Sequence, residues 1–323
     1  MYNYVHRVGR IPAALRFQGI IMKISDILKK KKLSLSFEIF PPKQQSSYES
    51  VIDAAMKLCS FNPDFMSITY GAGGSTKRNT VQIAHELQTK GKATALAHLT
   101  CVGASKTDIA NAAKEMAQFG IENVLALRGD IPQPDANGNM PEGFFDAWKE
   151  EGFAHASDLV AELKKQGDFC VGGACYPEGH PESYNRDIDI ENVKYKVEAG
   201  CDFLTTQMFF DNDMLYSFLY RLQSKGIHVP VLAGIMPITQ SSQIKRMIKL
   251  SNAYIPRKLL MIVDRFQDSP EALMQAGIAY ATDQIIDLIS NGVRGIHIYT
   301  MNKPNVAEAI VSNINSIVKA VNA

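Results

Sequence analysis

The chain of 323 residues lacks the features that define several protein classes. It contains no uninterrupted run of about 18 apolar residues, which argues against a membrane-spanning helix. Its 34 basic and 33 acidic residues leave a net charge of +1, so no overall charge attracts it to nucleic acid or to an anionic membrane. We therefore expect a small-molecule substrate and no nucleic-acid or membrane partner.

The sequence also lacks a cysteine framework and a recognisable metal motif. Its five cysteines are odd in number and include no Cys-x-x-Cys pair, which argues against a disulfide scaffold or a zinc ribbon. Such cysteine usage fits a reducing compartment, and we expect a cytoplasmic protein. The seven histidines show neither His-x-x-x-His nor His-Glu-x-x-His spacing, so no metal site is predicted.

Motifs for nucleophilic and phosphate chemistry are missing as well. No Gly-x-Ser-x-Gly elbow is present, and no lysine lies in mid-strand as a Schiff-base aldolase would need. The segment 69–76 is glycine-rich but is no Walker A loop, and Thr76 replaces the third glycine of the dinucleotide fingerprint. Two interpretations stay open for this segment, a backbone cradle for phosphate and a tight turn followed by a helix cap.

Short β-rich apolar segments alternate with helical patterns along the chain. Strands are expected at 33–40, 65–70, 94–102, 123–127, 169–176, 202–208, 229–235 and 295–299. Helices are expected at 48–60, 77–89, 106–119, 155–166, 190–199, 213–225, 240–250, 270–291 and 306–321. Eight strands, each followed by a helix, favour a single-domain α/β fold, the (β/α)8 TIM barrel, over a doubly wound sheet.

Features between the elements refine this organisation. Left-handed helix ends are expected at glycines that follow helices, namely Gly91, Gly120, Gly167, Gly200, Gly226 and Gly292. The Pro- and Gly-rich stretch 131–152 is either a mobile loop at the top of the barrel or a surface insertion. The barrel domain is expected at 23–323. Residues 1–22 carry three arginines and no acid, and we expect a disordered extension there, with a targeting presequence as the alternative.

Polar residues at the strand ends are the candidates for chemistry, because barrel active sites lie there. Glu38 alternates with apolar neighbours, so it is either a functional acid with a raised pKa or a structural carboxylate bonded to backbone. Arg128 and Asp130 could bind a phosphate and a cation-like group, or could form an ion pair at the rim. Gln207 offers both donor and acceptor to the edge of a heterocycle, and Tyr176 and His180 could contact a flat ligand.

Taken together, these strand ends resemble the methylenetetrahydrofolate reductase family, the flavin-dependent folate enzymes with a (β/α)8 catalytic barrel. The matching segments occur in family order at 37–43, 69–76, 98–101, 126–130, 176–182, 206–211 and 297–302. The resemblance implies that FAD, reduced by NADH or NADPH, passes hydride to 5,10-methylenetetrahydrofolate and yields 5-methyltetrahydrofolate for methionine synthesis. It also implies the bacterial type with the catalytic domain only, so regulation through a C-terminal domain is not expected.

The resemblance implies a role for each matching residue. Glu38 matches the general acid that opens the folate ring, and Asp130 matches the Asp beside flavin and pterin. The implied FAD-binding residues are Thr69, His98, Arg128, Asp130, Tyr176, His180, Asp189 and Lys196. The implied folate-binding residues are Glu38, Gln207, Gln243 and Lys303. Asp189 and Lys196 are seven apart, so on one helix they share a face, and an exposed charge pair is their alternative.

Departures from the family leave further alternatives. Strand 7 reads Ala233-Gly234-Ile235-Met236-Pro237 where the family often has Pro-Gly-Ile-x-Pro, and Met247 stands where some members carry a stacking Phe. The electron donor could therefore be a nicotinamide or a partner redox subunit. A second hypothesis is a non-catalytic flavin- or folate-binding member of the family. The presence of Glu38, Asp130 and Gln207 in one sequence argues against it. The family is usually homo-oligomeric, and we expect the same here.

Overall fold

The computed structural model describes residues 21–42, 44–70, 74–131, 152–251 and 253–323. Within them, eight parallel strands close into a barrel in chain order, and β8 pairs with β1. The strands are β1 (Ser34–Ile39), β2 (Phe65–Ile68), β3 (Ala95–Thr100), β4 (Asn123–Leu127), β5 (Cys170–Cys175), β6 (Phe203–Thr206), β7 (Val231–Ile235) and β8 (Gly295–Tyr299). The predicted (β/α)8 barrel is confirmed, and the doubly wound alternative is wrong.

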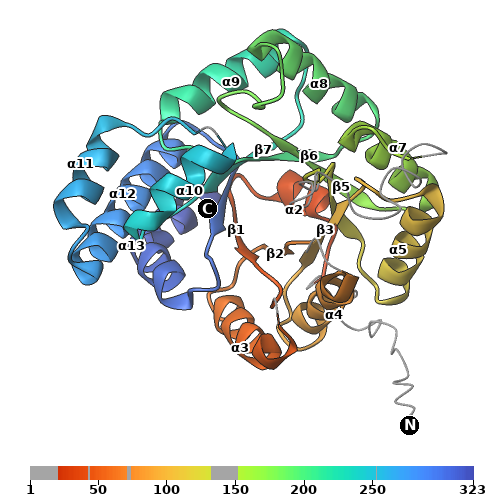
Figure 1. Cartoon of the computed structure of the whole chain (residues 1–323), viewed down its shortest axis with the longest axis horizontal. Coiled ribbons are helices and arrows are strands. Elements are labelled where there is room, and N and C mark those ends of the chain that lie inside the picture. Colours follow the sequence, from red (N-terminus) through yellow and green to blue (C-terminus); the bar gives the residue numbers. More distant parts are fainter. Residues whose placement is uncertain (1–20, 43, 71–73, 132–151, 252) are drawn as a thin grey trace, which may run out of the picture.

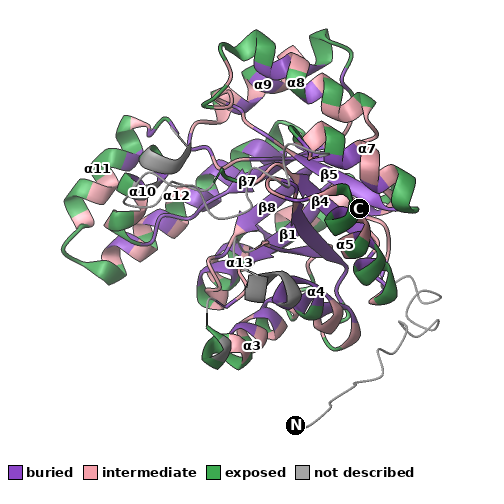
Figure 2. Cartoon of the chain, turned by 45° about the vertical axis from the view of Figure 1, so that its right-hand side comes forward, coloured by how far each residue is buried: buried purple, intermediate pink, exposed green. Residues whose placement is uncertain are grey.

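Helices surround the strands as an outer ring (Figure 1). They are α3 (Tyr48–Cys59), α4 (Gly74–Thr89), α5 (Lys106–Gln118), α7 (Ala156–Gln166), α8 (Arg186–Glu198), α9 (Asn212–Ser224), α10 (Ser241–Ser251), α11 (Arg257–Phe266), α12 (Pro270–Ser290) and α13 (Pro304–Asn322), with a 3-10 turn η1 (Gln45–Ser47). Apolar stripes face the strands, as Val51, Ala55 and Leu58 do in α3. Figure 2 shows this burial on the inward faces and exposure on the outward faces. In the described part of the chain, no helix combines the length and apolarity needed to span a membrane.

Alternation along the strands separates the core from the barrel interior. In β1, Phe37 and Ile39 belong to the core between strands and helices, whereas the intervening Glu38 contacts side chains of other strands across the interior. The register pairs Glu38 with Ser67 of β2 and with Tyr299 of β8. Side chains with the same parity on neighbouring strands therefore share one polar tier inside the barrel.

A short helix that the sequence patterns did not predict, α2 (Ile24–Lys30), closes the amino-terminal end of the barrel. Its Ile24 and Leu28 pack with the lowest interior residues, which are Phe65, Leu96, Leu125, Cys170, Phe203 and Leu232. The backbone N–H of Ile24 donates to Asn123 Oδ1 at 2.8 Å. Because this end is filled, a ligand of the barrel can enter only from the carboxyl ends of the strands.

The segment that leads into α2 is packed from Ile21 onward. Ile21 is buried, and the backbone N–H of Met22 donates to Thr94 Oγ1 at 3.2 Å. These two residues therefore belong to the folded domain and not to a disordered extension, because their contacts are made with the barrel. Residues 1–20, on which the rest of that expectation falls, lie outside the described residues.

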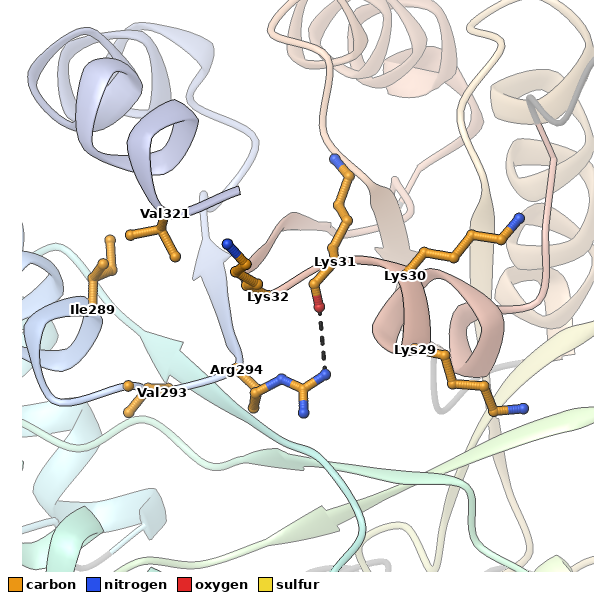
Figure 3. Close-up of a pocket in the computed structure, with 9 residues that line it drawn as sticks. Lys29, Lys30, Lys31, Lys32, Ile289, Val293, Arg294 and Val321 are labelled. Atoms are coloured by element: carbon orange, nitrogen blue, oxygen red, sulfur yellow. Dashed lines mark hydrogen bonds between the residues drawn. The ribbon is translucent and has the colours of Figure 1, made fainter. Parts of the chain in front are cut away.

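A pocket of about 450 Å³ lies at the same amino-terminal end, between α2 and the segment that precedes β8. Arg294 donates to the carbonyl oxygen of Leu28 at 2.5 Å and to that of Lys31 at 3.4 Å, which fastens α2 to the barrel. Figure 3 shows the bond to Lys31. The four lysines of this pocket, Lys29–Lys32, point in different directions (Figure 3). They do not converge on one point, so they form no preorganised anion site.

Four of the six predicted glycine helix ends are confirmed. Gly120, Gly200, Gly226 and Gly292 have φ values of 70°, 112°, 74° and 78°. The prediction is wrong at Gly167, whose φ of 169° is extended, and at Gly91. After α4 the left-handed residue is Lys92, with a φ of 53°.

A second helix absent from the sequence prediction, α11, lies between α10 and α12.

Candidate functional site

Four polar side chains from four strands meet inside the barrel toward the carboxyl ends. The carboxylate of Glu38, whose residue is 6% exposed, accepts a hydrogen bond from Ser67 Oγ at 3.4 Å. His98 Nε2 lies 3.5 Å and His297 Nε2 3.8 Å from the same Oε2 atom. The carboxylate is thus held by side chains of other strands, which differs from the alternative of a carboxylate bonded to backbone. A carboxyl group at this place faces the end of the barrel from which a ligand can enter.

His98 is neutral in this environment. Burial lowers the pKa of His98 from 6.5 to about 4, and the nearby Glu38 only partly opposes this effect. Its Nε2 atom is buried and has no hydrogen-bond partner in the described part of the chain. A buried ring nitrogen without a partner is costly, and such an atom at the floor of a site is available to a ligand.

The rim of the barrel after β4 holds an ion pair that differs from the expected one. Arg128 donates to Glu182 through Nη1 at 2.5 Å and Nη2 at 2.8 Å. The predicted alternative, an ion pair between Arg128 and Asp130, is therefore wrong, because the partner of Arg128 is Glu182. Asp130 is exposed at this rim and still acts electrostatically on Arg128 and Tyr176. One guanidinium and two carboxylates therefore gather at this point of the rim.

Two aromatic rings stand together after β5. Tyr176 and His180 meet edge to face, with ring centroids 4.6 Å apart and an interplanar angle of 75°. Burial, together with the charge of Asp130, raises the pKa of Tyr176 to about 12, and burial lowers the pKa of His180. His180 Nδ1 accepts the backbone N–H of Glu182 at 3.1 Å, so this loop turns back toward the Arg128 ion pair. The structure therefore brings Tyr176, His180 and Arg128 into one cluster.

Helix α8 carries the last two predicted cofactor residues. Asp189 is buried and accepts a hydrogen bond from Ser183 Oγ at 3.0 Å. Lys196 Nζ donates to the carbonyl of Ala174 in β5 at 2.5 Å. The alternative of an exposed charge pair is wrong, because Asp189 is buried and Lys196 reaches inward to the strand. Both charges act on His180, which places them next to the rim cluster.

Gln207 follows β6 directly and is half-buried. Its backbone N–H donates to Cys175 O at 2.7 Å, and its side-chain Oε1 accepts the N–H of Met208 at 3.0 Å. The backbone hydrogen bond to β5 fixes Gln207 at the carboxyl ends of the strands. The side-chain amide N–H groups remain available as donors at the mouth of the barrel.

Two predicted substrate residues meet through a third residue, Thr239, in the loop between β7 and α10. Gln243 Oε1 accepts the backbone N–H groups of Thr239 and Gln240, both at 2.8 Å. Lys303 Nζ donates to Thr239 Oγ1 at 3.1 Å. The loop thus joins Gln243 of α10 to Lys303, which precedes α13, although the two are far apart in the sequence. A cation and an amide are held on one side of the barrel mouth.

Met247 is buried and does not face solvent as an exposed stacking residue would. It belongs to a small apolar cluster beyond β7, together with Phe210, Met236, Ile238, Ile244, Ala253, Ile255 and Leu259. Tyr299 and Met301 pack against this cluster from the β8 side. The thioether therefore lies within an apolar wall that reaches the end of β8.

The remaining predictions concern Thr69, its loop and metal binding. Thr69 follows β2, its backbone N–H donates to Ile39 O at 3.1 Å, and its carbonyl accepts from Thr80 Oγ1 at 3.0 Å. The glycines 71–73 of the possible phosphate cradle lie outside the described residues, and so does most of the 131–152 stretch. In the described ranges, no group of three or more His, Cys, Asp and Glu residues could hold a metal ion.

Sequence reasoning gave no role to two residues of β8 that the structure places at the centre. His297 is 2% exposed and joins the polar tier around Glu38. Tyr299 donates its hydroxyl proton to Thr206 O at 2.6 Å, and it fits because Gly234 has no side chain. A Cβ atom on Gly234 would lie 2.6 Å from Tyr299 Oη. The alternation His297-Ile298-Tyr299 could have predicted this placement. Alternate residues of a strand point to opposite faces, so His297 and Tyr299 share the face opposite to the apolar Ile298.

Comparisons with known proteins agree with this geometry. The sequence model of the methylenetetrahydrofolate reductase family matches residues 23–315. The chain is 32% identical over 279 residues to a 5,10-methylenetetrahydrofolate reductase of Pectobacterium carotovorum, covering 86% of this chain and 89% of the relative. It is 34% identical over 309 residues to methylenetetrahydrofolate reductase (NADH) 1 of Arabidopsis thaliana, covering 92% of this chain and 51% of the relative. The chain therefore spans about half of the plant protein and about nine-tenths of the bacterial one.

A solved structure shares the fold. It is a protein from Clostridium thermocellum that binds two copies of 5-methyl-5,6,7,8-tetrahydrofolic acid, and it superposes with a TM-score of 0.60. The match covers 93% of this chain and 100% of that one, at 16% sequence identity. At this identity the likeness supports the barrel architecture alone.

Proposed function

The chain belongs to the methylenetetrahydrofolate reductase family, and we propose that it reduces 5,10-methylenetetrahydrofolate to 5-methyltetrahydrofolate through FAD, with NADH or NADPH as the electron donor. The observation that carries the proposal is Glu38. It is a buried carboxylate inside the barrel with a hydroxyl donor and two histidines beside it, at the end where ligands enter. This is the arrangement that a proton donor to a buried substrate requires.

The residues around the rim suit FAD. Arg128 and Lys196 supply the positive charge for its diphosphate, and the rings of Tyr176 and His180 offer a surface for a flat group. The unpartnered Nε2 atom of His98 supports the same interpretation, because a bound ligand would satisfy it. Thr69, Asp130 and Asp189 complete the proposed set. When bound, FAD supplies the hydride chemistry that amino-acid side chains lack.

The opposite side of the mouth suits folate. The amide of Gln207 can pair with the polar edge of a pterin ring, and Gln243 stands on the same side as Lys303. The ammonium group of Lys303 can bind the carboxylates of a glutamate tail. The apolar wall that contains Met247 can cover the face of an aromatic ring. Folate would then lie with its pterin toward Glu38 and its acidic tail toward Lys303.

Glu38 and Asp130 act on the substrate in different ways. In its acid form Glu38 gives its proton to the nitrogen that leaves the one-carbon bridge, while the electron pair of the broken C–N bond stays on that nitrogen. The product of this step is a cation at the bridge and a carboxylate on Glu38. The negative charge of Asp130 at the rim stabilises the cation, and water returns a proton to Glu38 for the next turnover.

Glu38→Gln tests the proposal by separating the two half-reactions. The amide keeps the shape of the carboxyl group but has no acidic proton to give, so folate reduction should fall by about 10² to 10⁴-fold. Bleaching of the flavin spectrum by the nicotinamide should persist in stopped flow. Glu49→Gln, at an exposed position of α3, is the matched control. A wild-type rate of folate reduction in Glu38→Gln, or a protein that takes up no FAD, would contradict the proposal.

A partner redox subunit is the second candidate for the electron donor. Met247 stands in the apolar wall where some relatives have an aromatic ring, which weakens the case for nicotinamide stacking. Kinetics with NADH, NADPH and reduced ferredoxin, measured side by side, decide between the donors.

A homo-oligomer is also proposed. Its interface could cover exposed apolar residues on or near α10 and α11, which are Ile248, Tyr254, Leu260 and Met261. The five free cysteines fit a reducing, cytoplasmic location.

A further inference from the structure

Four side chains form a continuous polar chain across β1, β2 and β8. Ser36 Oγ lies 2.8 Å from His297 Nδ1, and Ser67 Oγ lies 3.2 Å from His297 Nε2. Ser67 Oγ is also 3.4 Å from Glu38 Oε2. The order Ser36, His297, Ser67, Glu38 thus leads from the barrel interior to the carboxyl group that acts as the acid in the proposed reaction.

The supply of protons fixes the direction of these hydrogen bonds. When Glu38 is ionised, its Oε2 atom can only accept, so Ser67 donates its single hydroxyl proton to it. The oxygen of Ser67 then accepts from His297, which puts the imidazole proton on Nε2. His297 Nδ1 is left as an acceptor for the hydroxyl of Ser36, to which it lies closer, at 2.8 Å, than the other acceptor Ile296 O, at 3.3 Å. One tautomer of His297 therefore satisfies the whole chain.

The chain is closed at its inner end. Ser36 and Ser67 are 0% exposed and His297 is 2% exposed, and the imidazole stacks on Phe65 with centroids 6.0 Å apart. Phe65 itself packs on α2, which fills the barrel below. A proton cannot reach bulk water through Ser36, so the chain orients groups and does not conduct protons. Reprotonation of Glu38 has to come from the open end.

The other carboxyl oxygen of Glu38 is differently placed. In the described ranges Oε1 has no hydrogen-bond partner, and the side chain keeps 8% exposure. Two more groups face Glu38, which are His98 of β3, neutral because burial lowers its pKa to about 4, and Tyr299 of β8, whose pKa is raised by burial and then by Glu38. Neither of them carries a compensating charge. The hydroxyl of Ser67 is therefore the one directed donor to this carboxyl group among the described residues.

We propose that His297 is a positioning residue that acts through Ser67 to hold the proton of Glu38 on Oε1, the oxygen that faces the substrate. This inference rests on the proposed function, in which Glu38 is the acid. With Oε2 occupied by the Ser67 hydroxyl, the acid proton resides on Oε1. It passes from there to the leaving nitrogen, which keeps the electron pair of the C–N bond. Without His297, the Ser67 hydroxyl is free to rotate away from Oε2.

Two substitutions at His297 form a matched pair. His297→Phe keeps a flat ring against Phe65 but cannot donate to Ser67, whereas the side-chain amide of His297→Gln can. In the FAD-loaded protein, we expect His297→Phe to slow single-turnover folate reduction about 10 to 100-fold, and His297→Gln to restore most of the rate. Bleaching of the flavin by NADH should change less than about twofold in both variants.

Ser67→Ala supplies the second line of evidence. Loss of the hydroxyl leaves Glu38 Oε2 without its directed donor, so the acid proton is no longer confined to Oε1 and single-turnover folate reduction should slow about 10 to 100-fold, as in His297→Phe. The double variant Ser67→Ala with His297→Phe should be no slower than the worse single variant, since both break one chain. If His297→Phe does not fold, His297→Gln and Ser67→Ala still decide the question.

The outcomes separate this inference from the proposed function. Equal loss of both half-reactions in His297→Phe, a wild-type rate of folate reduction in Ser67→Ala, or additive losses in the double variant would overturn the positioning role. If Glu38→Gln reduces folate at the wild-type rate, then Glu38 is not the acid and both proposals fail. If Glu38→Gln is inactive in folate reduction while His297→Phe retains the full rate, only the positioning role fails.

Discussion

Arg128 and Glu182, 54 positions apart, are joined side by side through two hydrogen bonds of 2.5 and 2.8 Å between guanidinium and carboxylate. The hydrogen bond from Arg128 lowers the pKa of Glu182, and the same pair raises the pKa of Arg128. The ion pair thus persists at neutral pH. It holds the guanidinium at the rim, where the diphosphate of FAD is proposed to bind, and the carboxylate competes with that anion.

Glu182→Gln should therefore strengthen FAD binding. The amide releases the guanidinium and removes a negative charge next to the diphosphate, and an exposed ion pair of this kind is worth up to about 1 kcal/mol. We expect the dissociation constant to fall about fivefold in a titration followed by flavin fluorescence. Glu191→Gln is the control, because it breaks the ion pair between Glu191 of α8 and Lys225, which follows α9. Unchanged or weaker binding in Glu182→Gln would contradict this role.

His98 should make the protein acid-sensitive. Its pKa is about 4 in the folded chain because of burial, against 6.5 when unfolded, so the unfolded chain takes up the proton first as the pH falls. The contribution to stability is fully present above pH 6.5 and decreases between pH 6.5 and 4, by about 3 kcal/mol in total. Urea unfolding of His98→Asn should lack this part of the pH dependence. His228→Asn, at an exposed position, should retain it.

Helix α2 should contribute stability without contributing to the site. Ile24 is fully buried among the lowest interior residues, and Ile24→Ala should cost about 2 to 4 kcal/mol of unfolding free energy in urea titrations. Lys30→Ala, at an exposed position of the same helix, should change it by less than about 0.5 kcal/mol. FAD affinity should stay unchanged in both variants. A loss below about 1 kcal/mol in Ile24→Ala would show that α2 is not a structural plug.

Gly277 of α12 lies against the loop that joins Gln243 to Lys303. A Cβ atom at this position would come within 1.6 Å of the carbonyl oxygen of Ile238, next to Thr239. Gly277→Ala must therefore displace the loop, and we expect a loss of about 3 kcal/mol in stability together with a raised KM for folate. Gln275→Ala, exposed on the same helix, should change neither quantity. An unaltered KM in a folded Gly277→Ala would separate this loop from folate binding.

Much of the fold could be predicted from local patterns. The strands 123–127 and 295–299 were predicted to the residue, because a strand of a parallel barrel is a short apolar run whose boundaries are polar or glycine. The candidate residues at the strand ends followed from the same patterns, since their place after a strand is local information. Helix α2 was not predicted because it has only seven residues, three of them buried. An apolar pattern over so short a segment cannot be distinguished from that of a loop.

The sequence by itself thus determined the alternation of eight strands with helices, the inward parity of Glu38 and the family resemblance. Only the tertiary structure decided which of these residues meet. Closure of the barrel places β8 next to β1, so His297 reaches Ser36 across 261 positions, and it pairs Arg128 with Glu182 and not with Asp130. Periodicity reports which face a side chain occupies, whereas its partners depend on the register between strands far apart in the chain. That register is set by the packing of the whole barrel.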